Sequence, residues 1–258
     1  MIFKKGLADS LAGRFELLRA YHWNFSQWVE AFGGTLDEYL VYGGYPGAAE
    51  YQKDEQRWLD YIRTSIVEAV IGKDIMQQTK IARPALFKQV FELCCSYPAA
   101  EISLRKLVGQ LQDPGSIETV KTYMEILEGA FLLKTLQKFT SNALQKKSSS
   151  PKLLPLAPAL VTFARQEVQM DTEERGLLFE LMVGLELLRL PGELFYWRED
   201  QHEVDYVYKK GKKIWAIEVK SGRKKGTKGL MKFKDAFSQA ELLLVSPDNV
   251  QEILKSLW

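Results

Sequence analysis

From residue 176 to its end, the sequence alternates helical and strand-like patterns in an order that strongly limits the folds available to it. A helical pattern comes first, is broken by Pro191-Gly192, and is followed by three strand-like stretches at 194–198, 203–208 and 213–219. A basic loop, a helix near 228–239, a short apolar strand at 242–245 and a final helix complete the pattern. A helix that links two strands favours their parallel pairing. The sequence therefore predicts a small α/β domain, and an α/β class (α+β overall) for the whole chain.

Two carboxylates and a lysine in this part of the sequence are predicted to share one face of the sheet. Glu218 and Lys220 are two residues apart on a strand, so both side chains point to the same side. If Lys210-Gly211 form the centre of a two-residue hairpin turn, Asp205 pairs with Ala216. Asp205 then lies diagonal to Glu218, with roughly 7–8 Å between backbones, and the two carboxylates can bind one cation. A three-residue turn would place them on opposite faces.

A third carboxylate, Glu180, lies within an apolar helix, with Gly176 and Gly184 four residues away on either side. Such a stripe of small and acidic residues can approach a sheet closely. Two carboxylates about 5 Å apart repel by roughly 3 kcal/mol at an effective dielectric near 20. Three of them need a divalent cation, a proton or Lys220 as counter-ion, and Mg²⁺ is the expected cation. The alternative is a cross-strand salt bridge between Glu218 and Lys220, with Glu180 as a solvated or paired core carboxylate.

Positive charge is concentrated beside these residues. The net charge of the chain is +2, yet the segment Lys209–Lys234 holds eleven Lys and Arg residues and a single acidic one. Such a patch predicts binding of a polyanion, although a solvated basic face is an equally good interpretation. The candidate contacts to nucleic-acid phosphates are Lys212, Lys213, Arg223, Lys224, Lys225 and Lys228.

The preceding segment, residues 35–145, is predicted to be mostly helical. Periodic apolar residues indicate helices over 55–72 and 84–95. Residues 101–139 then follow as helix, turn, helix and strand pair, which is typical of a winged helix-turn-helix. The second of these helices, Ser116–Glu128, carries three glutamates against one lysine, so phosphate repulsion makes it a poor reader of the major groove. We expect it to serve in packing, in contact with a partner protein, or in a homo-oligomer.

The carboxylates and the lysine together resemble the active site of the PD-(D/E)xK restriction-endonuclease-like superfamily. The resemblance rests on Glu180 in the first helix, Asp205 on one strand, and Glu218 and Lys220 as a Glu-x-Lys triplet on the next. It implies that Glu180, Asp205 and Glu218 bind Mg²⁺, and that these residues and Lys220 form the catalytic set. In that superfamily the metal and the lysine position and activate water for attack on a phosphodiester.

A wider resemblance covers nearly the whole chain. The stretches at 11–28 and 36–49, the winged-helix segment and the C-terminal motifs resemble a large prokaryotic family of AAA-type ATPases whose members carry a C-terminal domain of unknown function. Leu11–Arg14 is similar to the end of the ATPase core. The resemblance implies three regions: the tail end of an ATPase domain at 1–34, a helical and winged-helix region at 35–145, and a nuclease-like domain at 146–258.

The chain also departs from that family. It contains no GxxxxGK[ST] motif, so we do not expect this polypeptide to bind ATP on its own, and we expect a truncated gene product or a part of a longer protein. At 155–160 the sequence is Pro-Leu-Ala-Pro-Ala-Leu, where related sequences usually carry an aspartate before the following helix. This departure puts any role of that loop in doubt.

Composition excludes several other classes of protein. The only cysteines, Cys94 and Cys95, are adjacent, which excludes an ordinary intrachain disulfide framework, and with only two histidines a structural zinc site is not expected. No apolar run approaches the about 20 residues of a membrane span, and the N-terminus has no signal-peptide core. We therefore expect a cytoplasmic protein with no membrane partner.

Three classes of function follow from the sequence. The first is a Mg²⁺-dependent nuclease-like phosphodiesterase, coupled in complete family members to an ATPase motor. The second is an inactive nuclease-fold module that binds nucleic acid, and the third is an interaction protein. Convergence of Glu180, Asp205 and Glu218 on a single point would favour the enzyme, whereas dispersed carboxylates would contradict it.

Overall fold

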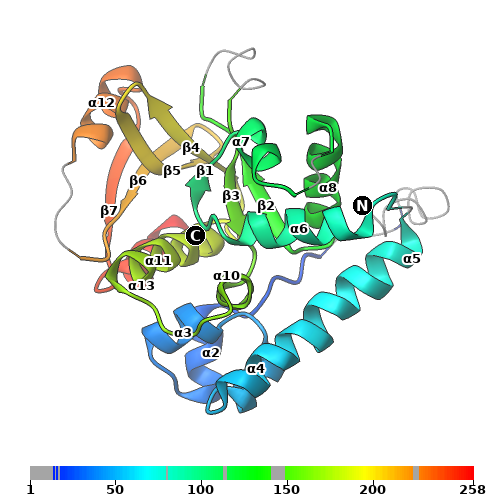
Figure 1. Ribbon diagram of the computed structural model, residues 1–258. Coiled ribbons are helices and arrows are strands. Elements are labelled where there is room, and N and C mark those ends of the chain that lie inside the picture. The colour runs from blue at the N-terminus through cyan, green and yellow to red at the C-terminus, as the bar shows by residue number, and fades with distance from the viewer. Residues whose placement is uncertain are drawn as a thin grey trace. The chain divides into compact units, whose positions relative to one another are not determined.

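A computed structural model describes the chain at residues 14, 16, 18–79, 81–112, 115–140, 149–222 and 227–258. The fold mixes helices with two small sheets, as the predicted α/β class requires (Figure 1). Contacts divide the chain into two compact units. Unit 1 comprises the chain up to Ser96, Leu104–Lys134 and Pro155–Val168, and unit 2 comprises Tyr97–Ser103, Thr135–Leu154 and Gln169–Trp258. Each unit is thus built from separate stretches of sequence rather than from one consecutive segment.

Unit 1 is predominantly helical. Its helices are α2 (Phe25–Phe32), α3 (Leu36–Tyr42), the 3₁₀ helix η1 (Pro46–Tyr51), α4 (Glu55–Tyr61), the π-helix η2 (Ile62–Ile75), α5 (Met76–Gln78), α6 (Pro84–Cys95), α7 (Leu104–Gly109), α8 (Ile117–Gly129) and α10 (Pro158–Arg165). The turn after α3 depends on Gly44, whose φ is +108° and where a Cβ would lie 2.5 Å from the Cβ of Ala157. Within the described residues, no helix is long and apolar enough to cross a membrane.

Unit 2 contains the predicted four-stranded sheet. Its strands are β4 (Glu193–Glu199), β5 (His202–Lys210), β6 (Lys213–Val219) and β7 (Glu241–Val245), which lie side by side in that order. The first three strands are antiparallel neighbours, and β6 pairs with β7 in parallel through the crossover helix α12 (Lys228–Ala236). The order of strands and the parallel final pair confirm the pattern predicted for this part of the chain.

A second, smaller sheet has the order β1-β3-β2, with β1 at Ala100–Glu101, β2 at Leu133–Leu136 and β3 at Lys152–Pro155. Directly after β2 the chain runs beside strand β4, and there Lys138 forms a parallel bridge with Tyr196. Strand β3 begins at Lys152, which is 6% exposed. This strand therefore brings a charged side chain into the interior of unit 2.

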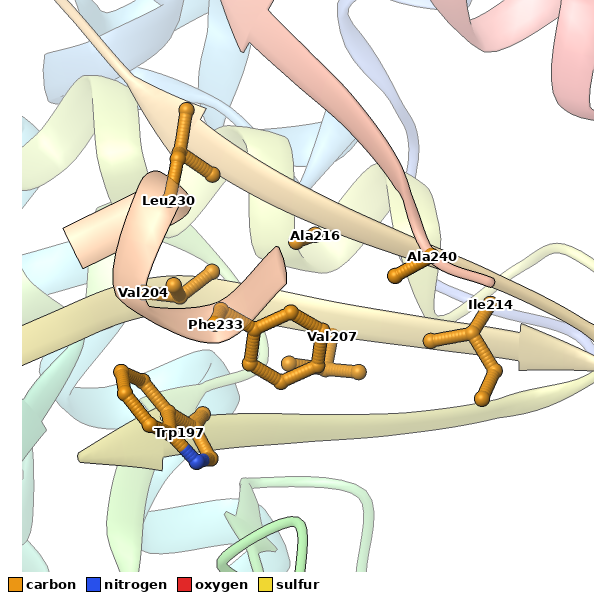
Figure 2. Close-up of a cluster of buried hydrophobic side chains, with 8 residues drawn as sticks. All are labelled: Trp197, Val204, Val207, Ile214, Ala216, Leu230, Phe233 and Ala240. Carbon is orange, nitrogen blue, oxygen red and sulfur yellow. The ribbon is translucent and has the colours of Figure 1, made fainter. Parts of the chain in front are cut away.

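The two faces of the four-stranded sheet are covered by different helices. Apolar residues from α12 and the strands form a buried cluster on one face, comprising Trp197, Val204, Val207, Ile214, Ala216, Leu230, Phe233 and Ala240 (Figure 2). On β6, Ile217 alternates with Ala216 and so points to the other face, where α11 (Thr172–Leu187) lies against β5 and β6. Helix α13 (Val250–Leu257) packs beside α11.

Helix α11 begins earlier than the predicted start at residue 176. Asp171 caps it, because its side chain accepts hydrogen bonds from the backbone N–H groups of Glu173 and Glu174, while Glu174 bonds back to Asp171. This capping box was visible in the sequence as Asp171 followed three residues later by Glu174. The cap fixes the start of the helix that carries Glu180.

Candidate functional site

The hairpin that carries Asp205 and Glu218 has a different turn from the predicted one. Lys210 pairs with Lys213, so the two turn residues are Gly211 and Lys212 rather than Lys210 and Gly211. Gly211 has a φ of +62° and occupies the first central position, where primed hairpin turns require a positive φ. The predicted pairing of Asp205 with Ala216 is therefore wrong.

The observed register differs from the predicted one by two residues. Ala216 pairs with Val207, and Tyr206 pairs with Ile217. The paired register ends at Tyr206 and Ile217, one residue before Asp205 and Glu218. The carboxylate of Asp205 nevertheless lies beside Glu218, because it accepts a hydrogen bond from the backbone N–H of the next residue, Val219, and its charge raises the pKa of Glu218.

Strand β5 contains a bulge at Asp205. Phe195 of β4 pairs with Val207, and Trp197 pairs with Val204. Between these pairs, two residues of β5, Asp205 and Tyr206, therefore stand opposite one residue of β4. A bulge redirects the side chains beside it, and bulges are common next to active sites.

The Asp205 carboxylate is held at the end of strand β6. Its Oδ2 accepts a hydrogen bond of 2.8 Å from the backbone N–H of Val219. The next residue, Lys220, donates its own backbone N–H to the carbonyl of Val245 at 2.8 Å, which ties this end of β6 to β7. The orientation of Asp205 is thus set by a backbone group that the sheet itself fixes.

Glu218 is a buried carboxylate that is only half satisfied. The residue is 8% exposed, and its Oε1 accepts a hydrogen bond from Nζ of Lys220. Its Oε2 is buried and has no hydrogen-bond partner among the described residues. Burial raises the pKa of Glu218, the charge of Asp205 raises it further, and Lys220 opposes both effects.

Glu180 projects from α11 and is paired with a residue that sequence reasoning missed. Nζ of Lys152 lies 2.6 Å from Oε1 of Glu180 and 2.9 Å from the backbone carbonyl of Asp205. The same ammonium lies 4.5 Å from the centre of the Tyr206 ring. The only sequence signal for Lys152 was its position as a single basic residue at the start of the apolar stretch Leu153–Leu156.

Burial and the neighbouring charges have opposing effects on the pKa of Glu180. Burial raises its pKa to about 7, and the negative charge of Asp205 adds to this shift, while Lys152 lowers the pKa and offsets only part of it. Burial acts to lower the pKa of Lys152, yet the charges of Glu180 and Asp205 outweigh it and raise that pKa, so the lysine remains a cation. Asp205 therefore acts electrostatically on both of the other carboxylates.

Helix α11 approaches the sheet closely, as its glycines predicted. A Cβ at Gly184 would lie 2.4 Å from the Tyr206 hydroxyl, and one at Gly176 would lie 3.0 Å from Oγ of Ser221. The hydroxyl of Tyr206 donates a hydrogen bond of 2.8 Å to the carbonyl of Glu180. The backbone of Glu180 is therefore held to β5 through Tyr206, and its side chain is linked to β5 through Lys152.

The structure does not gather all three carboxylates into a single ligand group. In the described part of the chain, no cluster of three or more His, Cys, Asp or Glu side chains is arranged to hold a metal ion. Glu180 bonds to Lys152 instead, and the Asp205 carboxylate lies beside Glu218, where it accepts the backbone N–H of Val219. The convergence of Glu180, Asp205 and Glu218 expected from the sequence is therefore not seen among the described residues, and Glu180 is paired with a lysine instead.

The candidate phosphate contacts are distributed over both ends of β6. Lys212 and Lys213 lie at the hairpin turn, five residues or roughly 16 Å along the strand from Glu218. Lys228 begins α12, and the next residue, Gly229, is so close to the carbonyl of Glu203 that a Cβ there would lie 1.9 Å from it. The other three candidates, Arg223, Lys224 and Lys225, lie outside the described residues.

Several other lysines of the basic segment have structural partners. Lys210 donates to the carbonyl of Leu257 at 3.2 Å near the end of α13, and Lys234 donates to the carbonyl of Ala240 at 2.6 Å. Lys209 lies 3.9 Å from a carboxylate oxygen of Glu193. The charge of this segment therefore serves partly to hold unit 2 together.

Comparisons with known families match two parts of the chain. Residues 175–257 match a family model described as a domain of unknown function, DUF4143, which agrees with the expected C-terminal domain of unknown function. Residues 33–170 match a second model, also described as a domain of unknown function, DUF8612. Searches of curated proteins and of solved structures found no match. Because the second model covers more than half of the residues, the chain belongs to the DUF8612 family.

Proposed function

We propose that unit 2 is a Mg²⁺-dependent, nuclease-like domain that acts on nucleic acid, in a chain derived from the AAA-type ATPase family. The observation that carries this proposal is the buried Oε2 of Glu218, which has no hydrogen-bond partner among the described residues and lies beside the carboxylate of Asp205. A buried carboxylate oxygen without a partner costs free energy, so its presence calls for a ligand or a functional reason. A divalent cation bound at this position would satisfy it.

The residues at this end of β6 fit Mg²⁺ in number and kind. This ion binds proteins through one or two carboxylates and keeps water and substrate phosphate as its other ligands. Asp205 and Glu218 would hold it, and when bound the ion supplies an activated water and charge stabilisation at a phosphodiester. The three-carboxylate version of the site is not needed for this chemistry.

The chain's own groups would orient the reaction. The N–H of Val219 fixes the Asp205 carboxylate, so that side chain does not have to be ordered when a cation binds. Lys220 lies on the same strand face as Glu218, with its ammonium beside the carboxylate. There it places a positive charge where a phosphate oxygen would approach.

An inactive binding module is the second candidate, and two contacts favour it. The Lys152–Glu180 and Lys220–Glu218 pairs both neutralise a carboxylate without any metal. In such a module these pairs would be stabilising salt bridges, and the basic residues would hold nucleic acid without cleaving it. The two candidates differ in whether Mg²⁺ binds and in whether phosphodiesters are cleaved.

The winged helix expected from the sequence belongs to the same proposal. The order α6, β1, α7, α8, β2, β3 supports it, because a winged helix needs a strand between its first two helices and a strand pair after its third. Helix α8 carries the glutamates that oppose DNA binding. We therefore propose that this segment binds a protein partner or a second copy of the chain, with nucleic acid bound by unit 2.

Cleavage assays with matched variants test the proposed function. We expect Mg²⁺-dependent cleavage of single- or double-stranded DNA or RNA by the wild type, and its loss in Asp205→Ala and Glu218→Ala. Glu252→Ala is the control, since this carboxylate is exposed on α13. Circular dichroism checks that every variant is folded. Equal cleavage by all four proteins would contradict the proposal, and binding of nucleic acid without cleavage at any Mg²⁺ concentration would favour the inactive module.

A further inference from the structure

The most unusual charged group in unit 2 is Lys152. It is 6% exposed, and it contacts two elements of the candidate site, helix α11 and strand β5. An ammonium has three N–H donors and no acceptor. Two donors are used by Glu180 and by the carbonyl of Asp205, and the ring of Tyr206 lies beside the same nitrogen. The ammonium of Lys152 is therefore held in the candidate site by direct hydrogen bonds to two of its residues.

We infer that Lys152 is a positioning residue that acts as a built-in cation: it holds Glu180 apart from the metal and leaves Asp205 and Glu218 as the pair that binds it. The inference deepens the proposed function and rests on it for the metal. It assigns to Lys152 a role that sequence reasoning gave to a divalent ion. It also divides the three carboxylates into one structural and two metal-binding groups.

The energetics of burial support this division. A metal bound through Oε1 of Glu180 would displace Lys152 and leave the ammonium buried without its counter-ion. Breaking a buried ion pair in this way is strongly unfavourable. The hydrogen bond from the Tyr206 hydroxyl to the carbonyl of Glu180 holds the helix backbone in place as well.

The charge balance of the site points to the same pair. Lys152 and Lys220 each bond to one carboxylate, Glu180 and Glu218 respectively. Asp205 is bonded by a neutral backbone N–H, so its negative charge has no cationic partner of its own among these contacts. The excess charge therefore lies at Asp205, and it acts on Glu218, whose Oε2 has no hydrogen-bond partner among the described residues.

Lys152 also joins the two parts of the chain that the family models match. It lies within residues 33–170, whereas Glu180, Asp205 and Glu218 lie within 175–257. The site in unit 2 is therefore incomplete without a strand from the first matched segment. A site whose carboxylates all lie in the second matched segment thus depends on a residue outside that segment.

Binding of Mn²⁺, followed by electron paramagnetic resonance in the full chain, tests which carboxylates hold the metal. The decisive variant is the double replacement Lys152→Met and Glu180→Leu, which removes the pair and leaves the net charge unchanged. We expect its Mn²⁺ affinity to stay within about threefold of the wild-type value, because fully formed neutral pairs contribute little field at the metal. A loss of more than tenfold in the double variant would show that Glu180 is a ligand and overturn the inference.

Thermal unfolding in EDTA tests the pairing of Lys152 with Glu180 in the absence of metal. Lys152→Met should lower the Tm by several degrees, and the double variant should recover most of that loss, since an apolar pair can replace a buried ion pair. Additive losses would show that Lys152 does not act through Glu180, which would also overturn the inference. If the wild type binds no Mn²⁺, the proposed function fails, and the unfolding cycle still decides whether Lys152 and Glu180 act as a pair. If Lys152→Met does not fold, a folded double variant shows that Lys152 and Glu180 act as a pair. Its Mn²⁺ affinity then still tests whether Glu180 is a ligand.

Discussion

At the scale of single residues, the site is defined by how each carboxylate is compensated. The Asp205 carboxylate accepts a hydrogen bond from a backbone N–H, and Glu180 accepts one from the ammonium of Lys152. Glu218 accepts one from Lys220 through only one of its two oxygens. Three groups of the same chemical type thus have three different environments. Environments of this kind separate the roles that identical side chains play.

The raised pKa of Glu180 gives a testable pH dependence. Its folded-state pKa of about 7 lies above the ordinary value of 4.5, so the folded protein binds a proton more tightly than the unfolded chain does. The stability that this proton contributes is fully present below about pH 4.5 and is lost as the pH rises through 7. We therefore expect wild-type Tm to fall by a few degrees relative to Glu180→Gln between pH 5 and pH 8. A Tm difference between the two proteins that does not change with pH would contradict this expectation.

At the scale of elements, the close approach of α11 to β5 fixes the depth of Glu180 in unit 2. Gly184 permits this approach, because any side chain there would meet the Tyr206 hydroxyl. The contact then allows the hydrogen bond from that hydroxyl to the carbonyl of Glu180. A glycine one turn along the helix from Glu180 thus controls the geometry of the site.

Gly184→Ala should therefore destabilise unit 2. The Cβ would overlap Tyr206, and overpacking of this kind typically costs about 1–3 kcal/mol of unfolding free energy. Gly222→Ala is the matched control, because a Cβ there meets nothing within 4 Å, and we expect a change of no more than about 0.5 kcal/mol. Chemical denaturation measures both. Similar unfolding free energies for the two variants would show that the helix can move away from β5 without cost.

The elements of unit 2 were largely predictable, and the details of the site were not. Strict alternation and helical spacing revealed strands β4 to β7 and the helices around them, since burial of one face imposes those periods on the sequence. The bulge at Asp205 leaves no periodic signal, because an extra residue in one strand is visible only against its partner. The turn at Gly211 differs from the predicted one by a single residue, which composition alone does not resolve. Lys152 was missed because its partner Glu180 is distant in sequence and nothing in the intervening residues links them.

At the scale of the whole molecule, two family models describe a chain whose compact units do not coincide with them. The DUF8612 model covers residues 33–170, yet unit 2 takes in a part of that range that includes the start of β3. As a result, Lys152 of the first matched segment lies in the candidate site, where its charge pairs with Glu180 of the second matched segment. The two segments are therefore expected to function together and not as independent modules.

The distribution of basic residues leads to a prediction for nucleic-acid binding by the whole chain. If nucleic acid approaches the end of β6 that carries Glu218, then Lys228 and its neighbours contribute, and Lys212 and Lys213 at the opposite end do not. All six candidates together would give a slope of log affinity against log salt of about −5, and the four at 223–228 would give about −4. We expect a slope near −4 that Lys212→Glu with Lys213→Glu leaves unchanged, whereas Lys228→Glu should reduce it by about 1. Fluorescence anisotropy with a labelled oligonucleotide measures these slopes, and a drop of about 2 in the hairpin double variant would place the nucleic acid at the other end of the strand.

The central claim, that Asp205 and the free oxygen of Glu218 bind a divalent cation, is tested most directly by isothermal titration of Mg²⁺. Glu218→Gln keeps the shape of the side chain and an acceptor for Lys220, but removes the charge that the cation needs. The account predicts one Mg²⁺ site in the wild type and in the exposed control Glu252→Gln, and a loss of affinity of at least tenfold in Glu218→Gln. Equal Mg²⁺ binding by all three proteins, or no binding by the wild type, would contradict it.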